Sequence, residues 1–183
     1  HDTAYDHMFL DGLEDAYQAG AAMGSFAQET ANEYQLTREA MDEYSIESLR
    51  RANAAIASGA FADEVVPVIV TSRKGETIVD IDEQPAKGRP EKIPELRPAF
   101  AKDGTITAAS SSSISDGAAA LVLTRASTAE AKGLTPVAKI VAMAAHAHDP
   151  KLFTTAPLGA IQKALAKAGW SIDDVDLFEV NEA

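Results

Sequence analysis

The sequence predicts a layered α/β domain preceded by a region in which strands and helices do not alternate. From residue 117 onward, apolar runs typical of strands alternate with helical patterns, which is the order expected of a layered α/β domain. Before residue 112, helical patterns and two short β-rich runs occur without that alternation. We therefore place a boundary near residues 112–118.

Two helices are expected in the first part. Residues 24–35 carry apolar side chains at helical spacing. Residues 37–59 predict a second helix, because Thr37 can cap its N-terminus and Gly59 can end it. Its expected apolar stripe consists of Met41, Tyr44, Leu49, Ala52 and Ile56.

A β-hairpin or a pair of neighbouring strands is expected next, from the β-rich runs 63–70 and 76–82. Pro67 favours an edge position, since proline cannot donate to a strand ladder. The following stretch, 83–103, contains too much proline and glycine for a long helix. It is locally basic, through Lys87, Arg89, Lys92, Arg97 and Lys102. Two interpretations stay open: a solvated loop, or a rim that attracts an anionic ligand.

The second part predicts three strands and two helices. Strands are expected at 117–123, buried on both faces, at 136–147 and at 174–180. Helices are expected within 124–134, ending near Gly133, and within 156–170, where Pro157 suits a helix start and Gly169 a helix end.

Composition excludes several function classes. The net charge of −12 and the pI near 4.7 argue against nucleic-acid or anionic-membrane partners, which would repel such a surface. The chain has no cysteine, so a disulfide, a cysteine-ligated metal or a cysteine nucleophile is not contained in it. No run is long and apolar enough to span a bilayer, and the first residues lack a signal-peptide pattern, so we expect a cytoplasmic protein. Both ends suggest a fragment of a longer chain.

Three local features could carry chemistry. His146 and His148 would share a strand face, but a third convergent ligand is not identifiable, so we expect no metal site. The serine run at 110–113, followed by Ser-Asp-Gly, fits either a linker or a loop whose small side chains admit a ligand. Asn181 follows a predicted strand and could either donate toward an oxyanion or serve as a capping residue.

Longer motifs connect these features. The segments "MGSFAQETA", "RPAFAKDGTITAA", "ISDGAAALVL" and "KAGWSIDDVDLFEVNEA", in this order, closely resemble the thiolase family, in particular its acetyl-CoA acetyltransferase type. The resemblance implies a thiolase-like layered α/β fold of mixed sheets and helices, with an inserted α+β loop domain that embraces coenzyme A. Residues 1–113 would be that loop domain, 114–126 the return into the N-terminal half, and 127–183 the start of the C-terminal half.

The resemblance also implies a reaction. Thiolases condense two acetyl-CoA to acetoacetyl-CoA and CoA, or run the reverse thiolysis, through a cysteine acyl-enzyme, with coenzyme A thioesters as substrates and no separate cofactor. The family's catalytic cysteines and histidine would lie outside these residues, and Asn181 would hold the water of an oxyanion hole. An isolated chain of this length would be inactive, and the full subunit would be a homotetramer or homodimer.

Six positions match family contacts to coenzyme A. The resemblance assigns Ser112 a hydrogen bond to the pantetheine arm and places the others along the bound carrier: Ala108, Phe100, Met23, Leu13 and Ala183. Departures from the family pattern are Ala22 in place of histidine, Ala86 in place of arginine, Ser110 in place of asparagine and Phe153 in place of methionine. The alternatives are a 3-ketoacyl-CoA thiolase of fatty-acid β-oxidation and a non-catalytic module that binds acyl-CoA.

Overall fold

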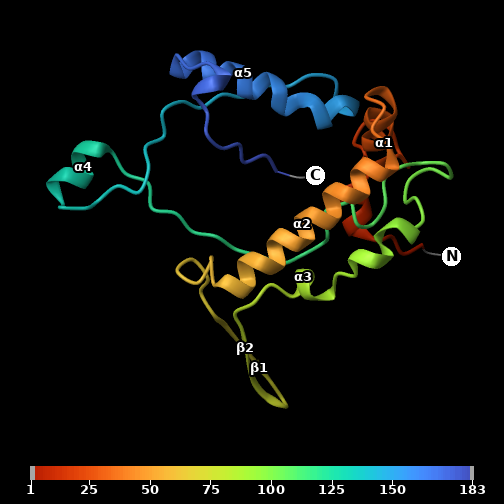
Figure 1. Cartoon of the computed structure of the whole chain (residues 1–183), viewed down its shortest axis with the longest axis horizontal. Helices are drawn as coiled ribbons and strands as arrows, with labels where there is room; N and C mark the ends of the chain where they lie inside the picture. The colour runs from red at the N-terminus through yellow and green to blue at the C-terminus, as the bar shows by residue number, and fades with distance from the viewer. Residues whose placement is uncertain (1–2, 182–183) are drawn as a thin grey trace. The chain divides into compact units, whose positions relative to one another are not determined.

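A computed structural model describes residues 3–181 of the chain (Figure 1). The chain separates into two compact units, one ending at Ser111 and the other starting at Ser112. Each unit is described by itself.

Two consecutive helices dominate the first unit, as the periodicity predicted. Helix α1 spans Met23–Glu33 and α2 spans Arg38–Ser58 (Figure 1). Thr37 Oγ1 accepts a hydrogen bond from Ala40 N at 3.2 Å and caps α2. Gly59 ends α2 in the left-handed conformation, with φ of 68°. Both predicted helix signals of α2 are therefore confirmed.

Four of the five residues of the predicted apolar stripe of α2 are half-buried, and the exception is Tyr44, which is 61% exposed. Asp42 and Ser45, outside the predicted stripe, are buried. Asp42 forms an ion pair with the first residue of the helix: Arg38 Nε donates to both carboxylate oxygens of Asp42, at 2.9 and 2.8 Å. A charged pair of this kind can be buried because its hydrogen bonds are satisfied.

Arg38 also fixes the segment that packs on α2. Its Nη2 donates to three backbone carbonyls at the C-terminal end of the 3₁₀ helix η2 (Pro90–Glu95), which packs against α2. These acceptors are Ile93 O at 3.1 Å, Pro94 O at 3.3 Å and Leu96 O at 2.8 Å. The last carbonyls of a helix carry partial negative charge, so a guanidinium is a suitable partner.

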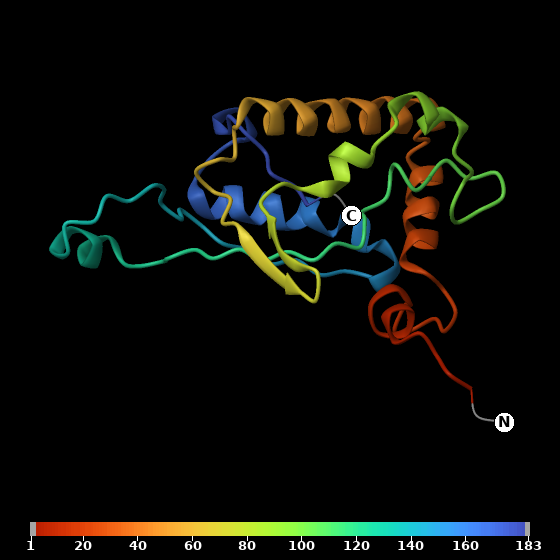
Figure 2. The same ribbon diagram turned by 90° about the horizontal axis from the view of Figure 1, so that it is seen from below.

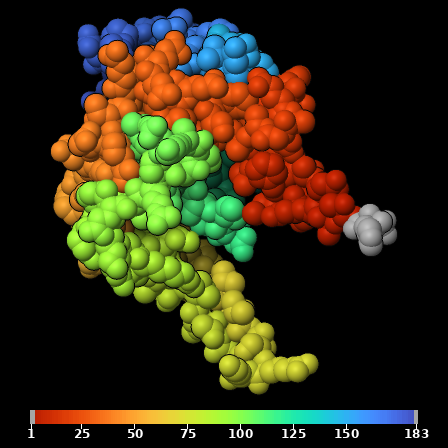
Figure 3. Space-filling view, turned by 90° about the vertical axis from the view of Figure 1, so that its right-hand side faces the viewer, coloured from red at the N-terminus to blue at the C-terminus, as the bar shows by residue number. Residues whose placement is uncertain are grey.

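The predicted hairpin is present. Strands β1 (Val68–Ser72) and β2 (Gly75–Val79) pair antiparallel, with Val68 opposite Val79. Gly75, at φ of 116°, begins the return strand in a conformation that glycine favours. Every residue of both strands is exposed, and the hairpin extends from the unit as an arm, drawn yellow in Figure 3.

The segment after the hairpin holds only short helices, as its proline and glycine content predicted. Helix α3 (Glu83–Lys87) begins at Asp82, whose side chain accepts from Gln84 N, and η2 follows it. Gly88, between them, lies so close to Leu49 of α2 that a Cβ there would meet the leucine methyls. This close packing holds the segment against α2.

The second unit contains the two predicted helices, α4 (Ala126–Ala131) and α5 (Ala156–Ala168), and two short 3₁₀ helices, η3 (Pro150–Thr155) and η4 (Ile172–Asp174). Gly133 and Gly169 follow α4 and α5 in the left-handed conformation. Figure 2 shows α4 between two long extended stretches of the chain.

The three strands predicted in this unit are not formed. Residues 117–123, 136–147 and 175–180 have no helix, and among the described residues none of them pairs as a strand; the last predicted segment, 174–180, begins with the end of η4. The apolar side chains of 117–123, expected to be buried, are exposed, and Val122 is 96% exposed. An apolar extended run becomes a strand only where a second strand satisfies its backbone groups. The segments are therefore not strands in this structure, because none of the described residues supplies a partner strand.

Helix α5 packs along one side of the segment 136–147. Exposure alternates along residues 141–146, as it does in a half-covered strand. Lys163 Nζ donates to Ala145 O at 3.3 Å, and Lys167 Nζ donates to Met143 O at 2.9 Å. Gly159 of α5 faces the His146 ring so closely that a Cβ would overlap it.

Among residues 3–181, the structure contains no helix with both the length and the apolar character required to cross a membrane.

Candidate coenzyme A surface

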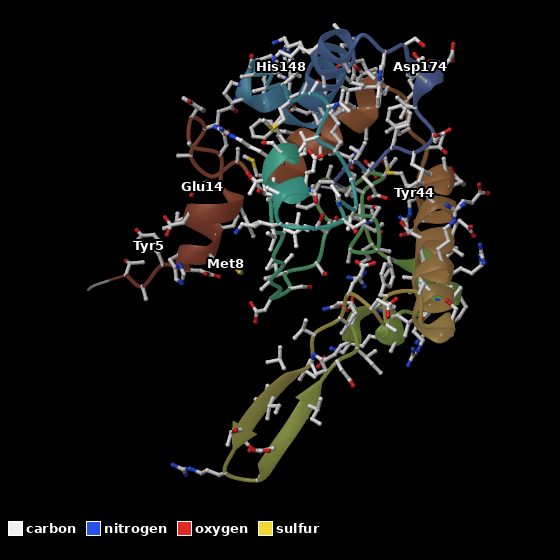
Figure 4. The ribbon with its side chains drawn as sticks, turned by 90° about the vertical axis from the view of Figure 1, so that its left-hand side faces the viewer. Tyr5, Met8, Glu14, Tyr44, His148 and Asp174 are labelled. Carbon is white, nitrogen blue, oxygen red and sulfur yellow. The ribbon has the colours of Figure 1, made fainter. Side chains whose placement is uncertain are left out.

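An isolated β-bridge brings two of the predicted contact residues together. Glu14 pairs with Ala22, so the residues flanking the bridge, Leu13 and Met23, lie opposite each other. Leu13 is the last residue of the π-helix η1 (Phe9–Leu13), and Met23 is the first residue of α1. Glu14, labelled in Figure 4, also accepts a hydrogen bond from Gly20 N and so closes the connecting loop.

Phe100 reaches the same helix start from a distant part of the chain. The far end of its ring lies against Gly24, the residue after Met23, where a Cβ would overlap ring carbons Cζ, Cε1 and Cε2. Phe100 is 38% exposed, so part of its ring stays open to a ligand. A partly exposed aromatic ring at the helix start that also carries Met23 offers an apolar surface to a ligand.

Gln28 connects α1 to the segment that carries Phe100 and Ala108. Its Oε1 accepts hydrogen bonds from Thr105 N at 3.0 Å and Ile106 N at 3.1 Å. Its Nε2 donates to Thr105 Oγ1 at 3.2 Å and to Asn32 Oδ1 at 3.0 Å. Gln28 is 4% exposed, so all four hydrogen bonds of its amide are made inside the unit.

The serine run begins as an ordered turn. Thr107 is 0% exposed, and its carbonyl accepts from Ser111 Oγ at 2.7 Å and from Ser110 Oγ at 3.4 Å. Thr107 N donates to Ser110 Oγ at 2.9 Å, and Ala109 N donates to Thr107 Oγ1 at 3.2 Å. Residues 107–111 therefore form an ordered turn, and both interpretations of the serine run stay predictions. Ala108 lies at the outer side of this turn and is exposed.

Three predicted contact residues thus lie at the start of α1: Leu13, Met23 and Phe100. We name this group the α1 cluster. Ala108 follows two residues after Ile106, which is bonded to Gln28 in the second turn of α1. Ser112 and Asn181 are exposed residues of the second unit, and Ala183 lies outside the described residues. Asn181 follows an extended segment, as predicted, although that segment is not a paired strand.

Charge on the basic stretch is partly neutralised. Lys87 Nζ contacts Glu83 Oε2 at 2.7 Å, and this hydrogen bond lowers the pKa of the Glu83 carboxyl below its ordinary value. Arg89 donates to Ala86 O and Gly88 O, close to it in the chain. The remaining three basic residues of the stretch are exposed and have no ion pair among residues 3–181: Lys92, Arg97 and Lys102.

The histidine pair has other partners. The His146 and His148 rings form an edge-on contact with centroids 5.4 Å apart. His146 Nδ1 accepts from Lys163 Nζ at 3.1 Å, and His148 Nε2 donates to Leu152 O at 2.6 Å. Residues 3–181 contain no group of three or more potential metal ligands.

Comparison with protein families decides the relationship. Residues 1–127 match the model "Thiolase, N-terminal domain", and residues 134–183 match "Thiolase, C-terminal domain". The chain belongs to the thiolase family. The resemblance of the sequence motifs is confirmed.

Individual thiolases match along nearly the whole chain. An acetyl-CoA acetyltransferase of Paracoccus denitrificans is 45% identical over 179 residues, which are 97% of this chain and 46% of that protein. The crystal structure of the Bacillus anthracis acetyl-CoA acetyltransferase superposes with a TM-score of 0.94 at 40% identity, and that of human mitochondrial 3-ketoacyl-CoA thiolase with 0.85 at 34%. The match covers 100% of this chain and 46% of the bacterial one, and 97% of this chain and 45% of the human one. The chain therefore has the thiolase fold and spans about half the length of these relatives.

Sequence reasoning missed two residues that build this thiolase surface. Gln28, which lies within "MGSFAQETA", was assigned no role from the sequence. A single amide side chain on the inward-facing side of an amphipathic helix does, however, indicate buried hydrogen bonds. The role of Gly24 could not be predicted from its neighbours, because glycine is required there by the ring of Phe100, which is distant in sequence.

Proposed function

We propose that the chain is the coenzyme A-binding part of a thiolase-type acyltransferase subunit, which condenses two acetyl-CoA to acetoacetyl-CoA and CoA or runs the reverse thiolysis. The observation that carries this proposal is the α1 cluster, in which apolar side chains from three separate segments gather at one helix start. Such a surface suits the slender, mainly uncharged pantetheine arm. The identity to acetyl-CoA acetyltransferases supports this choice of substrate.

The basic stretch, residues 83–103, is proposed to bind the phosphate groups of coenzyme A. The 3′-phosphate and diphosphate of coenzyme A are anionic, and the chain as a whole is strongly acidic, so binding requires local positive charge. Lys92, Arg97 and Lys102 supply it on an exposed segment that leads directly to Phe100. We assign these three residues to the phosphates. Lys87 is a weaker candidate because it already forms an ion pair with Glu83.

The proposed chemistry uses a cysteine from outside these 183 residues, since the chain has none. Its thiolate attacks the acetyl-CoA carbonyl carbon, the carbon–sulfur bond breaks, and CoA leaves as its thiol after gaining a proton. A base removes a proton from the methyl carbon of a second acetyl-CoA, and the resulting carbanion attacks the acetyl-cysteine carbonyl. The cysteine leaves as a thiolate and acetoacetyl-CoA is formed. The role we propose for Asn181 is to orient a water that donates to the oxyanion.

We also keep the domain assignment as a proposal: residues 1–113 as loop domain, 114–126 as the return into the N-terminal half, and 127–183 as the start of the C-terminal half. The change of compact unit after Ser111 supports the first boundary. The exposed apolar segments 117–123 and 136–147 support the proposal that strands from the rest of a longer subunit pair with them.

The test compares the full-length subunit with the 183-residue chain. We expect the full-length subunit to cleave acetoacetyl-CoA with CoA and the shorter chain to show no turnover. Binding of CoA by the full-length subunit without turnover would favour the non-catalytic module. A clear preference for a long-chain 3-ketoacyl-CoA would favour the β-oxidation thiolase, which the similarity to the human mitochondrial enzyme keeps as second candidate.

Assembly and location also belong to this proposal. We propose a homotetramer or homodimer of the full subunit in the cytoplasm, without nucleic-acid or membrane partners. Light scattering coupled to gel filtration measures the first, and cell fractionation the second. A monomer, or recovery with the membrane fraction, would contradict these assignments.

A further inference from the structure

We propose that Gly24 is a positioning residue that determines where the Phe100 ring lies in the coenzyme A surface. This inference rests on the proposed function, because it assigns a consequence for CoA affinity to a contact inside the α1 cluster. The contact joins the second residue of α1 to an aromatic ring 76 positions further along the chain, as 100 − 24 = 76.

The reason for glycine at position 24 is space. Gly24 does not have a positive φ, so its backbone conformation does not require glycine. Within a helix, alanine is the more favourable residue by intrinsic propensity. The place of a Cβ is instead filled by the far end of the Phe100 ring. Glycine at position 24 therefore lowers the intrinsic stability of the helix, but it leaves the space that the Phe100 ring fills.

Hydrogen bonds hold the backbone of the segment that carries Phe100 to helix α1. Ala99 N donates to Ile106 O at 2.9 Å, and Ile106 N donates to Gln28 Oε1 at 3.1 Å. Gln28 belongs to the same helix as Gly24. This chain of hydrogen bonds holds the Phe100 segment to α1 one turn beyond the contact. A methyl group at position 24 would therefore be accommodated by rotation of the ring about its side-chain torsions.

Rotation of the ring has a defined consequence for a ligand. Phe100 is partly exposed, so a ring displaced from Gly24 turns toward solvent, where the proposed function places the carrier. It would then occupy space proposed for the pantetheine arm and lose its apolar contact with that arm. The loss of an aromatic side chain's apolar contact is enough to weaken binding about tenfold.

The experiment measures the dissociation constant of CoA by titration calorimetry for the full-length subunit and four variants. These are Gly24→Ala, Phe100→Ala, the double variant Gly24→Ala/Phe100→Ala, and Ser25→Ala as the matched control on the same helix. We expect Gly24→Ala to raise the dissociation constant about tenfold and Ser25→Ala to leave it unchanged. In the Phe100→Ala background, Gly24→Ala should have no further effect, because no ring remains to be displaced.

Two results would overturn the inference: unchanged CoA affinity of Gly24→Ala, or an equal loss in the presence and absence of the Phe100 ring. If Gly24→Ala alone does not fold, folding of the double variant would support the inference, because the overlap is removed, and an equally unfolded double variant would overturn it. Failure of the unmodified subunit to bind CoA is a separate outcome, which would contradict the proposed function itself.

Discussion

Gln28 and Thr105 are joined by two hydrogen bonds across 77 residues of sequence: Gln28 Oε1 accepts from Thr105 N at 3.0 Å, and Gln28 Nε2 donates to Thr105 Oγ1 at 3.2 Å. Because Gln28 is buried in α1 and Thr105 precedes the serine turn, this pair positions the turn on the helix. The coenzyme A surface that we propose depends on this connection, since Ala108 and Phe100 lie on either side of Thr105.

Replacement of Gln28 by alanine should destabilise the protein strongly. It leaves the backbone N–H groups of Thr105 and Ile106 without their acceptor, at an expected total cost of about 2 to 4 kcal/mol in the free energy of unfolding. Urea denaturation of the full-length subunit measures the loss. Gln28→Glu retains the acceptor oxygens and should lose less. Glu29→Ala, at the exposed neighbouring position, is the control. Equal stability of Gln28→Ala and Glu29→Ala would contradict this role.

Asp42→Asn should weaken the packing of η2 on α2. The substitution removes the charge that orients Arg38, whose Nη2 binds the carbonyls at the end of η2. We expect a loss of about 2 kcal/mol in the free energy of unfolding, since one member of a largely buried charged pair is left without its counter-charge. The matched control is Glu43→Gln, which removes an exposed carboxylate from the next position. A control that costs as much as Asp42→Asn would show that net charge, and not this pair, is responsible.

A pH effect is expected from Glu47. Its hydrogen bonds to Arg50 and Arg51 lower the pKa of the Glu47 carboxyl from 4.5 to about 2. A carboxyl whose pKa is lowered by folding contributes stability that is complete above pH 4.5 and is lost as the pH falls toward 2. Because the group is exposed, the effect should be small and weakened by salt.

Melting curves at several pH values test this expectation. Glu47→Gln should melt slightly below the unmodified protein at pH 6, and the difference should disappear as the pH approaches 2. Glu29→Gln, on the neighbouring helix, controls for the loss of one negative charge. A difference that grows on acidification has the wrong sign and would rule out the assigned cause.

Asn181→Ala and Ser112→Val should affect different kinetic constants of the full-length subunit. If Asn181 orients the oxyanion water, its loss lowers kcat about 100-fold and changes the KM for acetyl-CoA little. If Ser112 binds the pantetheine arm, its loss raises KM several-fold, in line with one hydrogen bond, and leaves kcat nearly unchanged. Steady-state kinetics with acetoacetyl-CoA and CoA separates the two. An effect of Asn181→Ala confined to KM would remove it from the oxyanion site.

Local signals in the sequence predicted the helices and the hairpin well. Thr37 and Gly59 mark the ends of α2, and Gly169 marks the end of α5, because caps depend only on neighbouring residues. The failures have a common physical cause. The segment 117–123 has the composition of a buried strand, but its pairing depends on residues distant in sequence, and none of the described residues supplies it.

The candidate site shows the same division. The family motifs placed Met23 and Phe100 on a shared surface, and the structure brings these two residues to one helix start. What joins them could not be predicted, because the Gln28 hydrogen bonds and the space above Gly24 are relationships between segments. Tyr44 illustrates the converse: its periodic position suggested burial, but it is exposed, whereas Asp42 of the same helix is buried in an ion pair with Arg38.

Hydrogen exchange of the full-length subunit with and without CoA tests the central claim most directly. We predict that CoA slows exchange in residues 23–28 and 99–112, which form and follow the α1 cluster, and leaves the exposed hairpin at 68–79 unchanged. Slower exchange at the hairpin, or anywhere else, with no change in those two segments while CoA is bound would contradict the account.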